Sequence, residues 1–197
     1  MNCLIAGVGG QGTVLASKLI AAAAMLRGME ARTTETIGMA QRGGSVVSHV
    51  RMGRDIASPL IAHGTADIVI AFEPAEAVKV LPYLAENGTA IVCDSAVMPI
   101  TSALDGGYGA PGMVEYILKT IKNATIINGE QLIARCGNTK VLNVALLGAA
   151  VQSVAFPFDI NDLENAIKQM IAPQYLEINL LALYVGRSMV DEAVGRN

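Results

Sequence analysis

The sequence predicts an α/β protein with a three-layer, Rossmann-like, mainly parallel sheet and a C-terminal helical extension. Short apolar runs alternate with stretches of helical periodicity along the 197 residues, which is the pattern of βαβ units. Hydrophobic residues make up 52% of the chain and the mean hydropathy is +0.46, as expected when helices cover strands on both faces. We expect a Rossmann-like domain over residues 1–155 and C-terminal helices over 156–197 that pack on the same domain.

The expected elements follow this alternation in order. The predicted strands are Asn2–Ala6, Glu30–Thr36, Ser45–Arg51, Ala66–Phe72, Thr89–Cys93 and Ala124–Ile127. The predicted helices are Gly12–Arg27, Glu73 to about Leu84, Gln131–Cys136, Val141–Val154, one capped by Asp159 or Asn161 that runs to about Met170, and Pro173–Val194. Asn87-Gly88 is expected to end the second helix, and residues 94–112 are expected to form a long loop.

The composition excludes several classes of protein. The net charge is −3 and no basic run is present, so a nucleic-acid partner is not expected. The apolar stretch Val14–Leu26 is too short for a bilayer, and the N-terminus lacks a signal-peptide pattern, so we expect a cytoplasmic protein without a membrane anchor. The three cysteines form no C-x-x-C pair, which predicts no disulfide framework, zinc site or iron–sulfur site.

A glycine turn follows the first predicted strand. Gly7, Gly9 and Gly12 have the spacing of a dinucleotide fingerprint, and the helix that starts there would add partial positive charge for a phosphate. Glu35 lies 23 positions after Gly12, where it would hold a ribose hydroxyl or pair with Arg42. The turn either contacts the phosphates of a nucleotide or of coenzyme A, or serves packing and subunit docking, with the Gln11 carboxamide bridging to a neighbouring chain.

A second glycine motif, Met39-Ala40-Gln41-Arg42-Gly43-Gly44, lies between the second and third predicted strands. A planar guanidinium beside flexible backbone is typical of an anion clamp. The alternative is an interface salt bridge from Arg42, with the glycines permitting a bulge. The residues predicted to contact a cofactor are therefore Gly7, Gly9, Gly10, Gln11, Gly12, Arg42, Gly43 and Gly44.

Other polar residues have structural interpretations. Glu73 and Glu76 follow a strand end where α/β sheets bind ligands, yet helix capping also explains them. His49 and His63 have no nucleophilic partner at an interpretable spacing, and Asn143 is expected in a buried or interfacial hydrogen-bond set. We predict no catalytic residue and no metal ligand on this chain.

Several segments resemble the gamma-type subunit of 2-oxoacid:ferredoxin oxidoreductases, and most of all its indolepyruvate form. These are the glycine turn, the segment Glu35–Gly44, and Ser48–Arg51. The likeness continues through Ala66-Asp67, Phe72–Ala77, Gly137–Asn143 and Leu147–Ala149, and so covers most of the chain.

The resemblance implies oxidative decarboxylation of a 2-oxoacid to an acyl-CoA, with electrons passed to ferredoxin. It places thiamine diphosphate and iron–sulfur clusters on a large catalytic (alpha) subunit, so this chain would bind no cofactor alone and would at most contact coenzyme A. The alternatives are a free-standing NAD(P)- or FAD-binding oxidoreductase and a ligand-free assembly scaffold.

Overall fold

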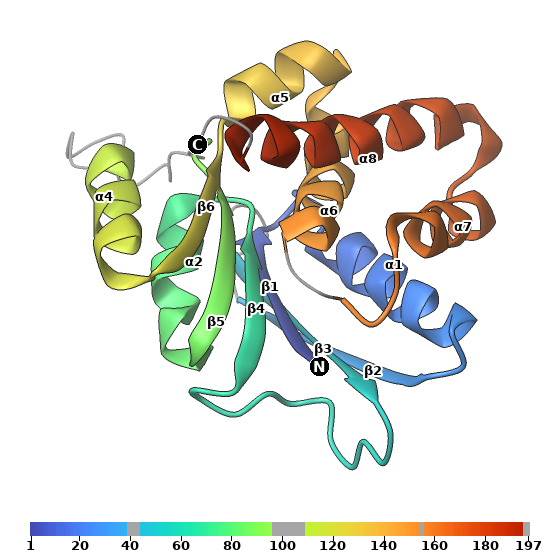
Figure 1. The fold of residues 1–197 in the computed structure, drawn as a ribbon, viewed down its shortest axis with the longest axis horizontal. Coiled ribbons are helices and arrows are strands. Elements are labelled where there is room, and N and C mark those ends of the chain that lie inside the picture. The colour runs from blue at the N-terminus through green and yellow to red at the C-terminus, as the bar shows by residue number, and fades with distance from the viewer. Residues whose placement is uncertain (39–43, 96–108, 154–155, 195–197) are drawn as a thin grey trace.

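The computed structural model describes residues 1–38, 44–95, 109–153 and 156–194, which contain one six-stranded sheet with helices on both faces (Figure 1). The strands lie in the order β2-β3-β1-β4-β5-β6. Their bounds are β1 (Asn2–Val8), β2 (Glu30–Ile37), β3 (Ser45–Gly53), β4 (Ala66–Ala71), β5 (Leu84–Cys93) and β6 (Asn123–Ile127).

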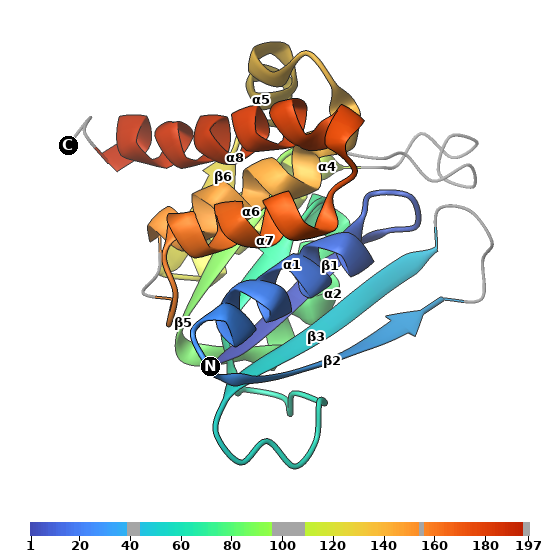
Figure 2. The same cartoon turned by 90° about the vertical axis from the view of Figure 1, so that its right-hand side faces the viewer.

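The sheet is mainly parallel, which confirms the predicted fold class, with one reversed strand. β1, β4, β5 and β6 pair in parallel, whereas β3 is antiparallel to both β1 and β2. The reversal follows from the short connection between Ile37 and Ser45, because a parallel crossover needs a dozen or more residues. β3 lies between β1 and β2 (Figure 2). The sequence did not predict this strand order.

Helices cover the two faces unequally. The larger core lies under α1 (Thr13–Leu26), α5 (Gly129–Cys136), α6 (Leu142–Ser153), α7 (Ile160–Met170) and α8 (Pro173–Val194). The smaller core lies under α2 (Pro74–Val80) and α4 (Ala110–Thr120). Short 3-10 turns, Leu81–Tyr83 and Thr139–Val141, complete the described elements. Figure 1 shows the same division of the helices between the two faces.

The C-terminal helix α8 packs closely against α6. A Cβ atom on Gly186 would lie 1.8 Å from the Ala145 carbonyl oxygen, and one on Gly148 would lie 2.0 Å from the Leu183 carbonyl oxygen. Both positions therefore require glycine, because a side chain would force the two backbones apart. This contact joins the end of the chain to the core that α6 forms with the sheet.

Two boundary predictions were wrong. α2 ends at Val80, and Asn87-Gly88 lies inside β5 rather than ending a helix. The β4–β5 register shifts between Ala66 and Ile68, and a Cβ on Gly88 would lie 2.9 Å from the Ala66 carbonyl oxygen, so this glycine permits a close approach of backbones. Helix α4 (Ala110–Thr120) was not predicted, and it begins within the expected 94–112 loop, of which residues 96–108 lie outside the described residues.

Within the part of the chain that the structure describes, no helix is both long enough and apolar enough to cross a membrane.

Candidate functional site

The candidate site lies where the sheet changes its winding direction. β1 leads into α1 on the face of the larger core, whereas its parallel neighbour β4 leads into α2 on the opposite face. In open α/β sheets such a point leaves a crevice outside the carboxyl ends of the strands, where ligands bind. The glycine turn follows β1 at this edge, and Glu73 follows β4.

The Gln11 side chain occupies the space beneath the glycine turn. Its Oε1 accepts a hydrogen bond from the Val8 N–H at 2.8 Å, and its Nε2 donates to the Phe72 carbonyl oxygen at 3.4 Å. A Cβ on Gly7 would lie only 2.7 Å from Gln11 Oε1. The carboxamide thus bonds at both ends within this chain and links the ends of β1 and β4.

Several backbone groups of the turn also bond within the chain. The Gly9 N–H donates to the Gly44 carbonyl oxygen at 2.8 Å, and the Gln11 N–H donates to the Val8 carbonyl oxygen at 3.1 Å. Gly10 has a φ of 99°, and no atom of a described residue lies within 4 Å of the position its Cβ would take. Among the described residues, nothing therefore covers the Gly10 side of the turn.

Helix α6 supports the start of α1 through Asn143. This side chain is buried, donates from Nδ2 to the Gly12 carbonyl oxygen at 3.3 Å and accepts from the Val144 N–H at 2.9 Å. A Cβ on Gly12, which has a φ of 79°, would lie 2.4 Å from Asn143 Nδ2. The expected buried hydrogen-bond role of Asn143 is confirmed, and its partner is the glycine turn.

The second glycine motif reaches the same place through its C-terminal end. Met39–Gly43, including Arg42 and Gly43, lie outside the described residues, whereas Gly44 and Ser45 are placed beside the turn. The Ser45 Oγ donates to Glu76 Oε2 at 2.5 Å, and the Ser45 carbonyl oxygen accepts from the Gly38 N–H at 2.8 Å. Ser45 was not among the predicted site residues, although its position directly after Gly43-Gly44 was a usable signal.

The Glu73 and Glu76 carboxylates are both buried at the start of α2. Glu73 Oε2 caps the helix by accepting from the Glu76 N–H at 3.0 Å, so the capping interpretation is confirmed for Glu73. Burial raises the pKa of Glu73, and the negative charge of Glu76 raises it further. Its second oxygen, Oε1, has no hydrogen-bond partner among the described residues. Glu76 Oε1 pairs with Lys79 Nζ at 2.5 Å.

Glu35 does not lie beside β1. Because β3 intervenes, Glu35 is two strand spacings away from β1, roughly 10 Å, whereas a ribose-binding carboxylate ends the strand next to the glycine turn. Its Oε1 accepts from the hydroxyl of buried Ser17 at 3.2 Å. The alternative partner, Arg42, lies outside the described residues.

The histidines and cysteines are packed in the structure. His49 is buried, its Nδ1 accepts from the Ile61 N–H at 3.1 Å, and burial lowers its pKa. His63 packs edge-on to Tyr83 with ring centroids 4.2 Å apart. Burial raises the thiol pKa of Cys3, Cys93 and Cys136, which keeps all three in the unreactive thiol form.

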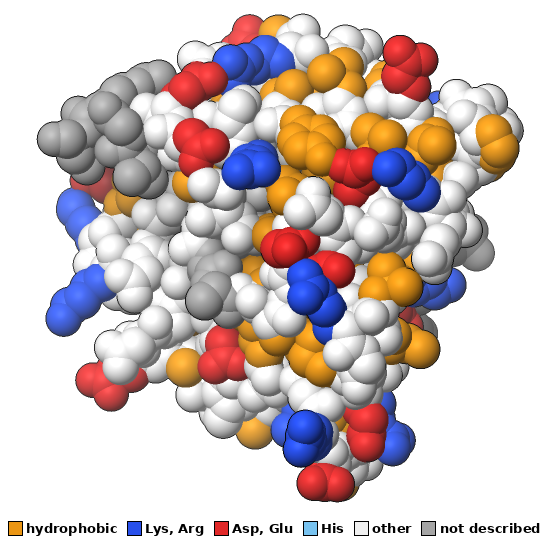
Figure 3. Space-filling model, turned by 45° about the vertical axis from the view of Figure 1, so that its right-hand side comes forward, with side chains coloured by type: hydrophobic (Ala, Val, Ile, Leu, Met, Phe, Trp, Pro, Cys, Tyr) orange, Lys and Arg blue, Asp and Glu red, His pale blue; other side chains and the backbone are white. Residues whose placement is uncertain are grey.

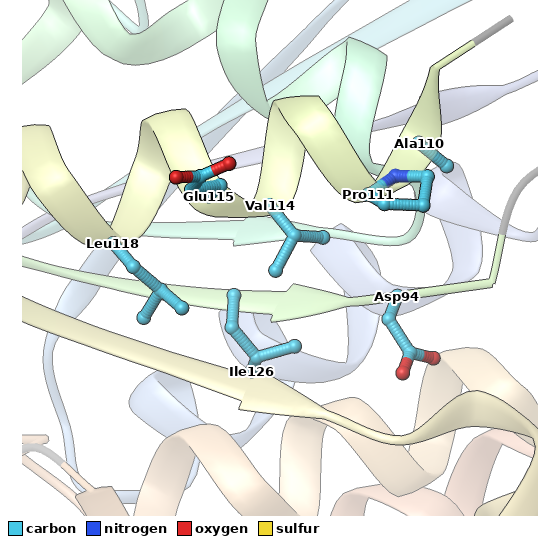
Figure 4. A pocket seen from close by; sticks show the side chains of 7 residues that line it. All are labelled: Asp94, Ala110, Pro111, Val114, Glu115, Leu118 and Ile126. Carbon is cyan, nitrogen blue, oxygen red and sulfur yellow. The ribbon is translucent and has the colours of Figure 1, made fainter.

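A cavity of about 440 Å³ lies between α4 and the β5–β6 edge of the sheet. Figure 4 shows Val114 and Leu118 of α4 facing Ile126 of β6 across it, with Asp94 at one end. The Asp94 carboxylate accepts from the Gly129 N–H at 2.8 Å and from Asn128 Nδ2 at 3.2 Å, which ties the ends of β5 and β6 together. A carboxylate and an amide that each directly follow a predicted strand were a sequence signal for this pair.

Some of the many apolar side chains of this protein are exposed on the surface of α7 and α8. Figure 3 shows apolar side chains among charged ones over these helices. The exposed apolar side chains there include Met170, Tyr175, Leu181 and Tyr184. Among the charged side chains near them, Lys168 pairs with Glu164 at 2.5 Å.

Comparison with known proteins gives the class of this protein. The model of the pyruvate ferredoxin/flavodoxin oxidoreductase family matches residues 2–189, and the chain belongs to that family. The resemblance to subunits of 2-oxoacid:ferredoxin oxidoreductases is therefore confirmed over nearly the whole chain.

Individual relatives narrow the class. The chain is similar to indolepyruvate oxidoreductase subunit IorB of Archaeoglobus fulgidus, with 38% identity over 94% of this chain and 93% of the relative. It is similar to the subunit of the same name from Thermococcus kodakarensis, with 30% identity over 98% of both chains. The 2-oxoglutarate synthase subunit KorC of Methanothermobacter thermautotrophicus is 27% identical over 95% of this chain and 94% of the relative.

Solved structures share the fold. The gamma subunit of a keto/oxoacid ferredoxin oxidoreductase from Geobacter sulfurreducens superposes with a TM-score of 0.71 at 23% identity, covering 97% of this chain and 98% of that one. A 2-oxoglutarate:ferredoxin oxidoreductase from Magnetococcus marinus gives a TM-score of 0.72 at 20% identity. The match covers 98% of this chain but 31% of that chain, so there the same fold is one part of a longer polypeptide.

Proposed function

We propose that this chain is the small, non-catalytic subunit of a coenzyme-A-dependent indolepyruvate- or arylpyruvate-type ferredoxin oxidoreductase. The complex would decarboxylate an aryl 2-oxoacid oxidatively to an acyl-CoA and pass the electrons to ferredoxin. A large catalytic (alpha) subunit would hold thiamine diphosphate and the iron–sulfur clusters. Residues 1–155 and 156–197 would act as one unit on that partner.

The observation that carries this proposal is the junction of the two glycine motifs. The Gly9–Gly44 hydrogen bond joins the turn after β1 to Gly44, the last residue of the second motif, so that this end of the motif lies at the switch point. Gln11 fills the space beneath the turn, which favours a contact surface over a deep nucleotide cradle. On that surface Gly10, Gly12 and Arg42–Gly44 would face the partner's active site and contact coenzyme A.

The aryl substrate is supported by the names of the relatives. The IorB subunits of four organisms are 30–38% identical to this chain, whereas the KorC subunits are 26–27% identical. The substrate itself would bind mostly on the large subunit, so the side-chain preference is a property of the complex.

Co-expression with the large subunit tests the proposal directly. We expect the two chains to co-purify and to reduce ferredoxin in the presence of indolepyruvate and coenzyme A. If the chain remains alone when both are expressed together, the proposal fails.

The glycine spacing also supports a second candidate, a free-standing NAD(P)- or FAD-dependent oxidoreductase. It predicts micromolar binding of a dinucleotide by the isolated chain. The Gln11 side chain between the ends of β1 and β4 and the displacement of Glu35 from β1 predict that calorimetry with NAD, NADP or FAD gives no binding heat.

The variant Arg42→Ala, assayed in the complex, distinguishes the proposed function from that of a ligand-free assembly scaffold. In the proposed function this variant raises the KM for coenzyme A. If it weakens subunit association and leaves that KM unchanged, the chain acts as a scaffold.

A further inference from the structure

The outward face of α8 carries an exposed apolar pair, Leu181 and Tyr184. Leu181 is 48% exposed and Tyr184 is 40% exposed, and their spacing of three residues places them side by side on the helix. A groove of about 540 Å³ between α8 and α5 adjoins them and includes Cys136 and Ile178. Figure 3 shows apolar side chains gathered over this part of the surface. Exposed tyrosine and leucine beside a groove are typical of a protein–protein contact surface.

The Tyr184 ring is held in place before any partner binds. Its hydroxyl donates to Glu164 Oε2 on α7, and Lys168 Nζ donates to the other oxygen of Glu164 at 2.5 Å. The opposite face of α8 packs directly on the α6 backbone at Gly186. Because helix and ring are already ordered, burying them against a partner costs little conformational entropy.

Two charged residues flank the apolar pair. Glu177 lies about one turn before the pair, and Arg187 lies about one turn after it. Within the part of the chain that the structure describes, neither residue forms an ion pair, whereas Glu192 near the end of α8 pairs with Arg135 at 2.6 Å. The surface therefore presents a negative charge at one end of the apolar pair and a positive charge at the other.

This arrangement is complementary to its own reverse. In two antiparallel α8 helices related by a two-fold axis midway between Leu181 and Tyr184, Leu181 of one copy lies opposite Tyr184 of the other. Glu177 of one copy and Arg187 of the other then lie at heights along the helix pair that differ by about 1.5 Å, the rise of one residue. A parallel pair would instead place like charges opposite each other.

We propose that the outward face of α8 is a self-association surface on which a second copy of this chain packs its own α8 antiparallel. Leu181 and Tyr184 form the centre of the contact, and an ion pair between Glu177 and Arg187 closes each end. The inference is independent of the proposed function, because it uses none of the residues assigned to the switch point.

The apolar centre is tested with the full-length chain. Sedimentation velocity should show a dimer for the wild type and a monomer for Leu181→Asp, because each copy would bury an unpaired carboxylate in the contact. Leu118→Asp is the matched control, since Leu118 is 53% exposed on α4, on another face of the molecule. It should leave the dimer unchanged.

Charge reversal tests the antiparallel arrangement. Glu177→Arg and Arg187→Glu should each raise the dissociation constant of the dimer about tenfold or more, because each places like charges opposite each other at both ends. The double variant Glu177→Arg/Arg187→Glu restores opposite charges and should return the dissociation constant close to the wild-type value. Glu115→Arg, on α4, is the control for a change of net charge and should have no effect.

Several results would overturn the inference. A wild-type chain that remains monomeric would do so, as would a double variant that associates no better than the single ones, since Glu177 and Arg187 would then not face each other.

Co-purification with the large subunit separates this inference from the proposed function. If the isolated wild type is monomeric and Leu181→Asp abolishes binding of the large subunit, that subunit covers α8, so self-association is wrong while the proposed function stands. If the wild type dimerises through α8 but binds no large subunit, the proposed function fails alone.

Discussion

Two helices, α1 and α2, start at the ends of the neighbouring strands β1 and β4, and their N-termini are stabilised in different ways. α1 begins after Gly12 with no side-chain cap and no acidic residue in its first turn, while Asn143 supports it from α6. α2 begins with the Glu73 cap and carries the buried Glu76 in its first turn. One helix start is thus free of negative charge, and the other contains two carboxyl groups.

The difference determines where an anion can bind at this edge of the sheet. The positive end of a helix attracts phosphate, but carboxylates already occupy that position in α2 and would repel a second anion. Within the described part of the chain, the start of α1 around Gly10 is the place that remains suitable. The carboxylates of α2 instead serve the protein itself, through the helix cap and the contact with Ser45.

Glycine substitutions at the α1 start should give the largest effects. Gly12→Ala combines a left-handed backbone at φ 79° with a contact of 2.4 Å to Asn143 Nδ2, whereas Gly10→Ala has the left-handed backbone alone. We expect losses in the free energy of unfolding of about 2–4 kcal/mol for Gly12→Ala and about 1–2 kcal/mol for Gly10→Ala. Urea unfolding of both variants measures the difference.

The double variant Gly12→Ala/Asn143→Ala provides the control. Removing the Asn143 side chain should relieve the crowding, so the double variant should be more stable than the sum of the two single losses indicates. Equal losses for Gly10→Ala and Gly12→Ala would show that Asn143 does not constrain the turn.

Gln11→Ala should have an intermediate effect. It removes the acceptor of the Val8 N–H and the donor to Phe72, and we expect a loss of about 2 kcal/mol in the free energy of unfolding. If the Gln11 side chain also prevents dinucleotides from binding at the crevice, calorimetry of the wild type should detect no NAD binding. Dinucleotide binding by the wild type would show that Gln11 leaves the crevice accessible.

Substitutions of Glu73 should give the smallest effect and one that depends on pH. Glu73→Ala loses the cap, at a cost of about 1 kcal/mol, whereas Glu73→Gln keeps an acceptor for the Glu76 N–H. Because the native pKa of Glu73 is raised, its stabilising contribution is complete below its unfolded value near 4.5 and is lost as the pH rises through the native pKa.

The pH profile of Glu73→Gln checks this sign. The variant carries no proton to lose, so its stability relative to the wild type should increase with pH above about 4.5 and then level off. A difference that is constant with pH would mean that burial does not affect the protonation of Glu73.

The sequence predicted most elements because their signals are local. Periodicity and terminal residues placed α6, α7 and α8, and the helix cap at Asp159 is present as expected. The errors occurred where contacts between residues that are distant in the chain determine the local structure. Asn87-Gly88 looks like a turn, yet pairing with β4 places it inside β5. Helix α4 was not predicted, because it starts in a glycine- and proline-rich segment.

The candidate site was predicted in pieces. The glycine turn, the carboxylates of α2 and Asn143 were each recognised, but no local pattern shows that they lie at one edge of the sheet. Ser45 carries no signal of its own beyond its place after Gly44, because its role comes from the Glu76 side chain 31 residues later.

The sequence by itself determined the fold class, the glycine turn and the family, since these depend on residue order and spacing along the chain. The tertiary structure alone decided that β3 separates β2 from β1 and that Gln11 fills the space beneath the turn. Strand order and the direction of a side chain depend on packing between distant segments, and the chemistry of the switch point follows from that packing.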